Sequence, residues 1–385
     1  MAILDDASTV LICRCLAVLA FIYCCILTAF RHSTGEEISS FDSLKEIVIH
    51  FMVMQNALTH THEDSFGLCI ACGAVAMWYI FSSYDRYVRG LKYATVDLSG
   101  KVYIVTGSNT GIGFQTAKAL AKMSATVILA CRSREKAISA KNQIVQETNC
   151  APSKIVALDL DLCDFDSVRQ FVKDFEALGF PLHCLINNAG LMMNERSVTK
   201  AGLEMNITAN HLSHFLLTNL LLKFLENTKG RVVVLSSALH RMAKSYDFDD
   251  MMAEKNYSLF GTYAQSKLAN ILFAFELQKR MEAKKTGVTC NVVHPGCVRT
   301  EVTRNMNAFM RIGDQIAAPF MKLIQKTPEQ GAYCSVHVAT AKELEGIGGK
   351  YYFNCDEGIL GPAAKLGTES ERLWKESEKL VGLKK

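Results

Sequence analysis

The chain has 385 residues, which is enough for one large domain or two of ordinary size. Hydrophobic residues make up 49% of it and charged residues 21%, a composition that excludes intrinsic disorder as the main state. The net charge of +4 comes with no block of basic residues and no alternation of basic and aromatic residues, so nothing in the sequence indicates a nucleic-acid partner.

The 14 cysteines are scattered through the chain and do not form a disulfide framework, which is typical of a protein in a reducing compartment. Cys69 and Cys72 make a C-x-x-C pair, but no second Cys or His pair follows at the spacing of a zinc site. We therefore expect cysteines that pack in the interior, and no metal site.

Two apolar runs lie in the first hundred residues, at 7–30 and 65–84, and the mean hydropathy of the chain is +0.12. A membrane span needs about 20 apolar residues, and aromatic residues such as those near the end of the second run favour the membrane interface. We interpret 1–97 as a membrane-anchoring region, with one or both runs spanning. A cleaved signal peptide is the alternative for the first run, and a buried helix for either. Basic residues after the second run predict that the following domain faces the cytosol: Arg86, Arg89 and Lys92.

A glycine-rich turn begins the second part of the chain, which we take as one domain over 98–385. The short apolar run 102–105 predicts a strand, and 114–122 has the spacing of a helix. In a strand–turn–helix context, glycines permit a tight turn and a close approach of the backbone to a pyrophosphate at the helix N-terminus. The residues of this expected dinucleotide site are Gly107, Ser108, Asn109, Thr110, Gly111, Ile112 and Gly113.

Arg132 follows the next expected strand, at 126–130. A site for NAD(H) would be expected to have an acidic residue at the end of this strand, to bind the ribose 2′-hydroxyl. A guanidinium there instead suits a 2′-phosphate, by its charge and its fork of donors. The sequence therefore predicts NADP(H), the alternative being an ordinary solvated arginine.

Four more strands are expected, at 154–158, 183–186, 231–235 and 288–293, separated by helices at 166–177, 204–225 and 262–283. This alternation predicts an α/β fold with a doubly wound parallel sheet. Ligands of such sheets bind beyond the carboxyl ends of the strands, and polar or small residues gather there in this sequence. They are Asp161, Asn188, Ala189 and Gly190, Ser237, and Pro295 and Gly296.

Tyr263 and Lys267 are four residues apart on one expected helix, so they share a face. A tyrosine ordinarily titrates near pH ~10, and a neighbouring ammonium is expected to lower its pKa. The pair could act as a general acid and base, although this spacing is also common on solvated helix faces.

Over about 98–355, the order and spacing of these residues resemble the short-chain dehydrogenase/reductase superfamily. Finer matches resemble its retinol dehydrogenase-like branch and the catalytic domain of the WW-domain-containing oxidoreductase, although no WW domain is present. These finer matches are Ala130-Cys131-Arg132, the stretch from Asn210 to Phe215, and the stretch from Ser266 to Asn270. Ser124 and Ser213 depart from the family pattern, since each stands where glycine is usual, and they put local packing in question.

The resemblance implies a role for each matching residue. Tyr263 would be the general acid and base, Lys267 would lower its pKa and bind the nicotinamide ribose, and Ser237 would hold the reacting oxygen of the substrate. Asn210 would hold a water that connects Lys267 to solvent. The implied cofactor contacts are Asp161 and Leu162 at the adenine, Asn188 to Gly190 beside the turn, Pro295 and Gly296, and Thr300 at the carboxamide.

An apolar, methionine-rich segment at 304–324 lies where a substrate lid would be expected, although an ordinary amphipathic helix would read the same way. With the expected anchor, it favours a lipophilic alcohol or carbonyl substrate of retinoid, steroid or polyprenoid type. The sequence thus predicts an NADP(H)-dependent oxidoreductase in a membrane, that of the endoplasmic reticulum, with the domain facing the cytosol; the family implies a possible homodimer. The alternatives are a cofactor-binding scaffold that acts through protein interactions, and a carbonyl reductase for soluble substrates.

Overall fold

The structure is a computed structural model, and it describes residues 92–298, 325–365 and 367–383. The apolar runs at 7–30 and 65–84, the segment 304–324 and Thr300 lie outside the described residues. Across the three described ranges, no helix combines the length and the apolar character needed to cross a membrane. The anchor therefore stays a prediction.

The described residues form one eight-stranded sheet with the order β3-β2-β1-β4-β5-β6-β7-β8. Neighbouring strands are parallel, except that β7 and β8 form an antiparallel hairpin at one edge. The expected doubly wound sheet is confirmed, and its strand order reverses between β1 and β4. The strands are β1 (Val102–Thr106), β2 (Thr126–Cys131), β3 (Ile155–Asp159), β4 (Cys184–Asn187), β5 (Arg231–Leu235), β6 (Thr289–His294), β7 (Tyr351–Phe353) and β8 (Asp356–Glu357).

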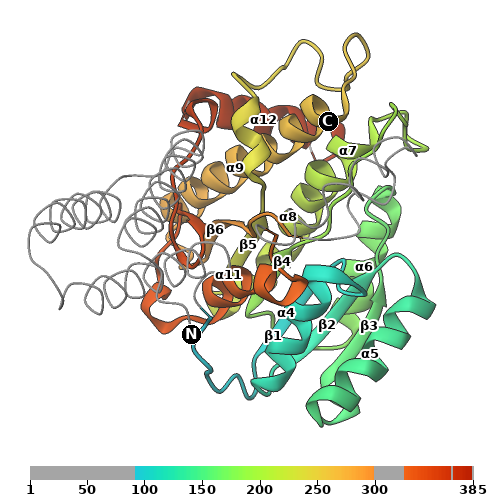
Figure 1. Ribbon diagram of the computed structural model, residues 1–385, viewed down its shortest axis with the longest axis vertical. Helices are drawn as coiled ribbons and strands as arrows, with labels where there is room; N and C mark the ends of the chain where they lie inside the picture. The colour runs from blue at the N-terminus through green and yellow to red at the C-terminus, as the bar shows by residue number, and fades with distance from the viewer. Residues whose placement is uncertain (1–91, 299–324, 366, 384–385) are drawn as a thin grey trace, which may run out of the picture. The chain divides into compact units, whose positions relative to one another are not determined.

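Helices cover both faces of the sheet (Figure 1). One core cluster lies under α4, α5 and α11, and it includes Tyr103 and Val105 of β1. The other lies under α6, α8 and α9, and it includes Ile104. Because both faces are covered, the central strands are nearly continuous apolar runs. These helices are α4 (Gly111–Lys122), α5 (Arg134–Thr148), α6 (Phe165–Ala177), α8 (Ser213–Thr228), α9 (Leu259–Lys284) and α11 (Pro328–Thr340).

The helix expected at 204–225 is interrupted. It consists of α7 (Met205–Ile207), a π-helical segment η2 (Thr208–Leu212) and α8. A π-helical turn holds one residue more than an α-helical turn, and such turns often occur at functional sites. Asn210 lies in the middle of η2, where all five residues are buried.

Three elements were not expected from the sequence: α5, α11 and the β7–β8 hairpin. Only Ala137, Ala140 and Ile144 of α5 are buried, and this narrow stripe of mostly small residues gives a weak hydrophobic pattern. The short remaining elements are η1 (Pro152–Lys154), η3 (Ala238–Met242), η5 (Lys342–Leu344) and η6 (Pro362–Lys365).

The C-terminal helix α12 (Gly367–Leu380) packs on α9, with Leu373 and Trp374 buried. The Trp374 ring makes an edge contact with Phe215, at 4.8 Å between ring centroids, and stacks on Phe273 at 5.9 Å. The guanidinium carbon of Arg280 lies 4.3 Å from the centroid of the Trp374 ring. Aromatic clusters of this kind contribute strongly to a core.

Candidate active site

The glycine-rich turn packs directly against the segment after β4. Gly107 has a φ of +65°, a conformation that L side chains rarely adopt, and a Cβ there would lie 2.9 Å from the Cβ of Ala189. A Cβ at Gly113 would lie 2.4 Å from both the Gly107 carbonyl oxygen and the Asn188 Nδ2. Glycine is required at both positions, because the turn must pass this close to its neighbours.

Thr106, the last residue of β1, joins the turn to that segment. Its Oγ1 accepts hydrogen bonds from the backbone N–H groups of Asn188 and Ala189, both at 2.9 Å. The Asn188 side chain donates to the Thr106 carbonyl oxygen at 2.7 Å. With both lone pairs of the hydroxyl used, its proton is free to bond His214 Nε2, which lies 2.9 Å away.

His214 connects Thr106 to the π-helical segment. Since its Nε2 accepts from Thr106, its Nδ1 carries the proton and donates to the Asn210 carbonyl oxygen at 3.0 Å. The ring is buried, and burial lowers the pKa of His214 to about 4. A neutral histidine therefore sets the position of the Asn210 main chain.

The Asn210 side chain is fully engaged. Its Oδ1 accepts from the Leu191 N–H at 2.8 Å, and its Nδ2 donates to the Leu191 carbonyl oxygen and to Ser266 Oγ, both at 2.9 Å. A Cβ on Gly190 would lie 3.2 Å from Lys267 Nζ and 3.4 Å from Asn210 Oδ1. The structure thus brings Asn210 and Lys267 together against Gly190.

Tyr263 and Ser237 also meet. The Ser237 side chain hydrogen-bonds the Tyr263 phenol, which favours the ionised form, but burial outweighs this and raises the pKa of Tyr263 to about 12. The expected lowering by Lys267 is wrong for the protein alone. The Lys267 ammonium instead donates to the Leu235 carbonyl oxygen at 3.3 Å and lies 5.6 Å from the centroid of the tyrosine ring.

Lys267 is only 3% exposed, and burial lowers its pKa to about 8. A buried ammonium loses its hydration, so the neutral form is favoured relative to water. The site therefore holds a protonated phenol beside an amine whose charge is easily lost.

A second buried histidine repeats the arrangement at Ser237. His240 Nδ1 donates to the Ser237 carbonyl oxygen at 2.6 Å, and its Nε2 accepts from the Gly361 N–H at 3.0 Å. Burial lowers the pKa of His240 to about 4. Sequence reasoning missed both histidines, although each lies three or four residues after a residue with an expected role.

A cleft of about 280 Å³ runs along the carboxyl ends of β1, β2 and β3 and along the segment after β4. Most of the residues expected at the cofactor line it, while Ser108, Pro295 and Gly296 do not and Thr300 lies outside the described residues. The four residues expected to be catalytic are also not part of its lining, and they meet beyond Gly190. The lining residues that were expected are Gly107, Asn109, Thr110, Gly111, Ile112, Gly113, Arg132, Asp161, Leu162, Asn188, Ala189 and Gly190.

One end of the cleft is basic. Arg132 lines it together with Lys136, which sequence reasoning missed even though it lies in the first turn of the helix after β2. Asp159 ends β3 beside Cys131 in the sheet register, and Arg134 holds it, with 3.6 Å between guanidinium and carboxylate. The acidic residue next to the end of β2 is thus paired with Arg134, and Arg132 is the residue that follows β2 and lines the cleft.

The two departures from the family pattern have local explanations. The Ser213 hydroxyl donates to the Leu162 carbonyl oxygen at 2.6 Å, so it fixes one wall of the cleft. Ser124 has a φ of +69°, the left-handed region that favours glycine. Ser213 therefore supports the site, whereas Ser124 introduces backbone strain in the turn before β2.

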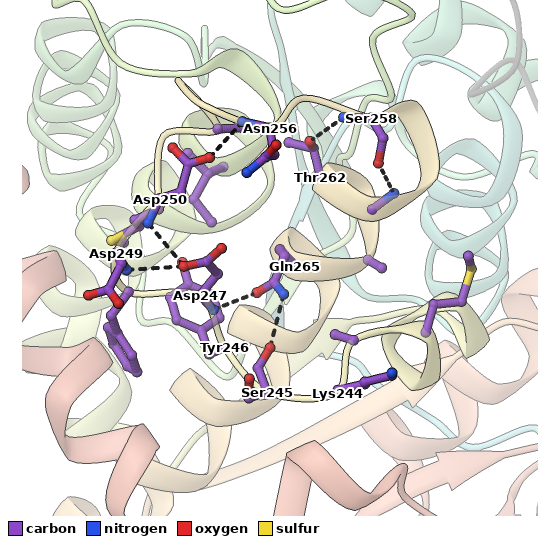
Figure 2. Close-up of a pocket in the computed structure, with 18 of the residues that line it drawn as sticks. Lys244, Ser245, Tyr246, Asp247, Asp249, Asp250, Asn256, Ser258, Thr262 and Gln265 are labelled. Carbon is purple, nitrogen blue, oxygen red and sulfur yellow. Dashed lines mark hydrogen bonds between the residues drawn. The ribbon is translucent and has the colours of Figure 1, made fainter.

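A larger cavity, of about 470 Å³, lies beside the start of α9. Figure 2 shows how its loop is held: Gln265 accepts from the Asp247 N–H at 3.1 Å and donates to the Ser245 carbonyl oxygen at 2.9 Å. The Asp250 carboxylate accepts from backbone N–H groups, among them that of Asn256 at 2.9 Å (Figure 2). The acidic side chains of Asp247 and Asp250 thus hold the loop in shape. Among the described residues, no group of three or more side chains could hold a metal ion.

Comparison with known proteins shows the family of the chain. Residues 101–311 match the family model described as short chain dehydrogenase. Retinol dehydrogenase 12 of Homo sapiens is 42% identical over 299 residues, which cover 77% of this chain and 92% of that protein. Polyprenol dehydrogenase of Danio rerio is 39% identical over 294 residues, covering 74% and 88%.

Solved structures share the fold. An uncharacterized protein from Mycobacterium Paratuberculosis is 29% identical with a TM-score of 0.61, covering 76% of this chain and 98% of that one. L-sorbose reductase from Gluconobacter frateurii, complexed with NADPH and L-sorbose, has a TM-score of 0.54 over 71% of this chain and 100% of that one, and at 19% identity it shows the fold alone. The chain belongs to the short-chain dehydrogenase family of oxidoreductases, and within that family it is similar to the retinol dehydrogenases.

Proposed function

We propose that this protein is an NADP(H)-dependent oxidoreductase that interconverts an alcohol and a carbonyl on a lipophilic substrate. The observation that carries the proposal is the meeting of Ser237, Tyr263 and Lys267 next to Gly190, at one end of the glycine-lined cleft. Proton donor, oxygen-binding hydroxyl and amine occur together there, as alcohol–carbonyl chemistry requires.

A nicotinamide cofactor supplies or accepts the hydride in this chemistry, and the residues present fit such a group. Gly107 and Gly113 let the turn pack closely against Asn188 and Ala189, and the N-terminus of α4, whose backbone N–H groups favour an anion, then lines the cleft. Ser237 orients the reacting oxygen of the substrate, and Tyr263 moves its proton.

The raised pKa of Tyr263 fits the direction of reduction directly. A phenol with a pKa of about 12 is protonated at neutral pH and is ready to donate to a carbonyl oxygen as it becomes an alkoxide. For alcohol oxidation the phenol must lose its proton first, and the Lys267 ammonium, which is still charged at pH 7 with a pKa of about 8, would stabilise the resulting phenolate.

Asn210 would act through its main chain. Its side chain is held by Leu191 and Ser266, so the water that connects Lys267 to solvent would be bound by the Asn210 carbonyl oxygen. That oxygen also accepts a hydrogen bond from His214 at 3.0 Å, so the histidine would fix where the water is bound.

Replacing Tyr263 by Phe tests the acid–base role. Turnover should fall by about 10²–10⁴-fold, the usual contribution of such a group, while NADPH affinity stays within about twofold. Steady-state rates and fluorescence titration of NADPH measure the two quantities. A Tyr263→Phe enzyme that keeps a tenth of the wild-type rate would contradict the assignment.

Arg132 and Lys136 support the choice of NADP(H), because their charges lie at the end of the cleft where a 2′-phosphate would be bound. Arg132→Ala should weaken NADPH binding by about 10–100-fold, as expected for lost hydrogen bonds to a charged group, and leave NADH binding unchanged. Exposed Lys173 on α6 offers a charge-matched control as Lys173→Ala. An equal loss for both cofactors, or none for either, would refute the preference.

A lipophilic substrate is supported by two exposed apolar side chains on the segments that carry the site. Met242, at the end of η3, is 58% exposed, and Phe260, three residues before Tyr263, is 40% exposed. The names of the similar retinol and polyprenol dehydrogenases point the same way. A turnover screen with NADPH against retinal, a steroid ketone, a polyprenal and a water-soluble ketone tests the substrate class. Activity on the soluble ketone alone would favour a carbonyl reductase for soluble substrates, and no activity on any of them would favour the cofactor-binding scaffold.

We further propose that 1–97 anchor the protein in the endoplasmic reticulum membrane and that 98–385 form the catalytic domain on the cytosolic side. The support is the pair of apolar runs and the basic residues after the second. In sealed microsomes, added protease should remove the catalytic domain; a domain that stays intact until detergent is added would refute the orientation.

A further inference from the structure

Two thiols outside the site are held against each other. Cys334 on α11 is 2% exposed, and Cys355 in the β7–β8 turn is half-buried. The Cys355 N–H donates to Cys334 Sγ at 3.4 Å, and the two side chains hydrogen-bond each other. Sulfur atoms in hydrogen-bonding contact need little further movement to form a bond.

The turn that carries Cys355 is tightly defined. Asn354 and Cys355 both have positive φ, +54° and +70°, as in the two-residue hairpin turns that match the twist of their strands. Phe353 pairs with Asp356 on either side of the turn. The position of Cys355 relative to α11 is therefore set by the sheet.

A buried cation lies beside both thiols. Lys326 is 4% exposed, its ammonium donates to the Asn354 Oδ1 and it lies 5.4 Å from the centroid of the Phe353 ring. Its charge acts on both sulfurs. A nearby ammonium stabilises a thiolate, which is the reactive form of cysteine.

The two thiols are unequal. The hydrogen bond from Cys334 and the charge of Lys326 lower the pKa of Cys355, although its partial burial opposes them. Burial raises the pKa of Cys334 well above its usual range. The more accessible sulfur is thus the better nucleophile, and the buried one is placed to react second.

We propose that Cys334 and Cys355 form an oxidation site that reacts with hydroperoxides and closes to a disulfide. The Cys355 thiolate attacks the terminal peroxide oxygen; an S–O bond forms, the O–O bond breaks, and hydroxide or alkoxide leaves, giving a sulfenic acid. The Cys334 sulfur then attacks the Cys355 sulfur, the S–O bond breaks, and water leaves with the Cys334 proton. The two thiols lose two electrons, and the hydroperoxide gains them.

The sheet provides an internal control. Cys184 on β4 and Cys290 on β6 lie on either side of β5, and both are fully buried, at 1% and 0% exposure. Burial raises the pKa of Cys184 to about 12 and raises that of Cys290 as well. Separated by a strand and kept from solvent, these thiols should not be oxidised under conditions that oxidise Cys355.

Mass spectrometry of the full-length chain tests the proposal. After brief treatment with hydrogen peroxide and alkylation, trypsin should release 327–342 joined to 351–365, and reductant should separate them. In Cys334→Ser, dimedone should label Cys355, whereas Cys355→Ser should give no linked peptide. Lys326→Met should slow the linkage by about tenfold, since one pKa unit is a factor of ten in thiolate.

The absence of the linked peptide from the folded wild-type protein would overturn the proposal, as would oxidation of Cys184 and Cys290 at the same rate as Cys355. The readout requires neither cofactor nor substrate, so its outcome is independent of the function proposed above.

Discussion

Lys267 should make the folded protein less stable at neutral pH than a neutral residue would. Burial lowers its pKa from 10.5 to about 8, and this gap corresponds to about 3 kcal/mol of unfolding free energy below pH 8, at 1.36 kcal/mol per pKa unit. Lys267→Met removes the charge and keeps a similar volume. The Leu235 carbonyl oxygen keeps a partner, because Asn270 Nδ2 donates to it at 3.0 Å.

The Lys267→Met variant should therefore be inactive but more stable at pH 7, by about 2–3 kcal/mol, as measured by urea unfolding without cofactor. Because the folded-state pKa is lowered, the cost is complete below pH 8 and disappears as the pH rises from about 8 to 10.5. The advantage of the variant should shrink over that window, and Lys173→Met, on an exposed surface of α6, should show no such trend. A Lys267→Met protein that is less stable than wild type at pH 7, or whose advantage does not change with pH, would refute the reasoning.

Three other substitutions test the structure in different places. Burial holds His240 neutral with a pKa of about 4, so its protonation destabilises the fold by up to about 3 kcal/mol as the pH falls from 6.5 towards 4. The urea midpoint of His240→Gln should therefore decline less between pH 7 and 5 than that of the wild type, and parallel declines would contradict this. Gly113→Ala places a Cβ 2.4 Å from the Gly107 carbonyl oxygen, so NADPH affinity by fluorescence titration should fall by about tenfold or more, and unchanged affinity would show that the turn can yield. Trp374→Ala should lower the free energy of unfolding by about 3–5 kcal/mol, measured by heat or urea, because the side chain is 4% exposed within an aromatic cluster. Trp374→Phe should lower it much less, and equal losses for the two variants would contradict the packing argument.

The first six strands and the glycine-rich turn could be predicted because they have strong local signals. Apolar runs such as Val102–Thr106 are recognisable when a strand is buried on both faces, and the turn residues that follow can be recognised by their spacing. Ser237, Tyr263 and Lys267 could be placed for the same reason, since each follows a strand or lies on a long helix.

The environment of these residues could not be predicted. The pKa of Tyr263 depends on how completely neighbouring elements bury it, and Lys267 bonds Leu235 from another strand. The roles of His214 and His240 depend on contacts with Thr106 and Gly361, which are more than a hundred residues away in sequence. Such contacts are set by packing and leave no periodic signal along the chain.

The central position of β1 has a consequence for folding. Tyr103 pairs with Cys184, so the first strand and its second neighbour come from stretches of chain that are separated by β2, β3 and three helices. Pairings between such distant residues are slow, because loop closure costs entropy before the contacts stabilise it. A ligand bound where β1 and β4 meet would hold together two parts of the sheet that assemble from separate stretches of chain, so cofactor added during refolding should raise the yield of native protein.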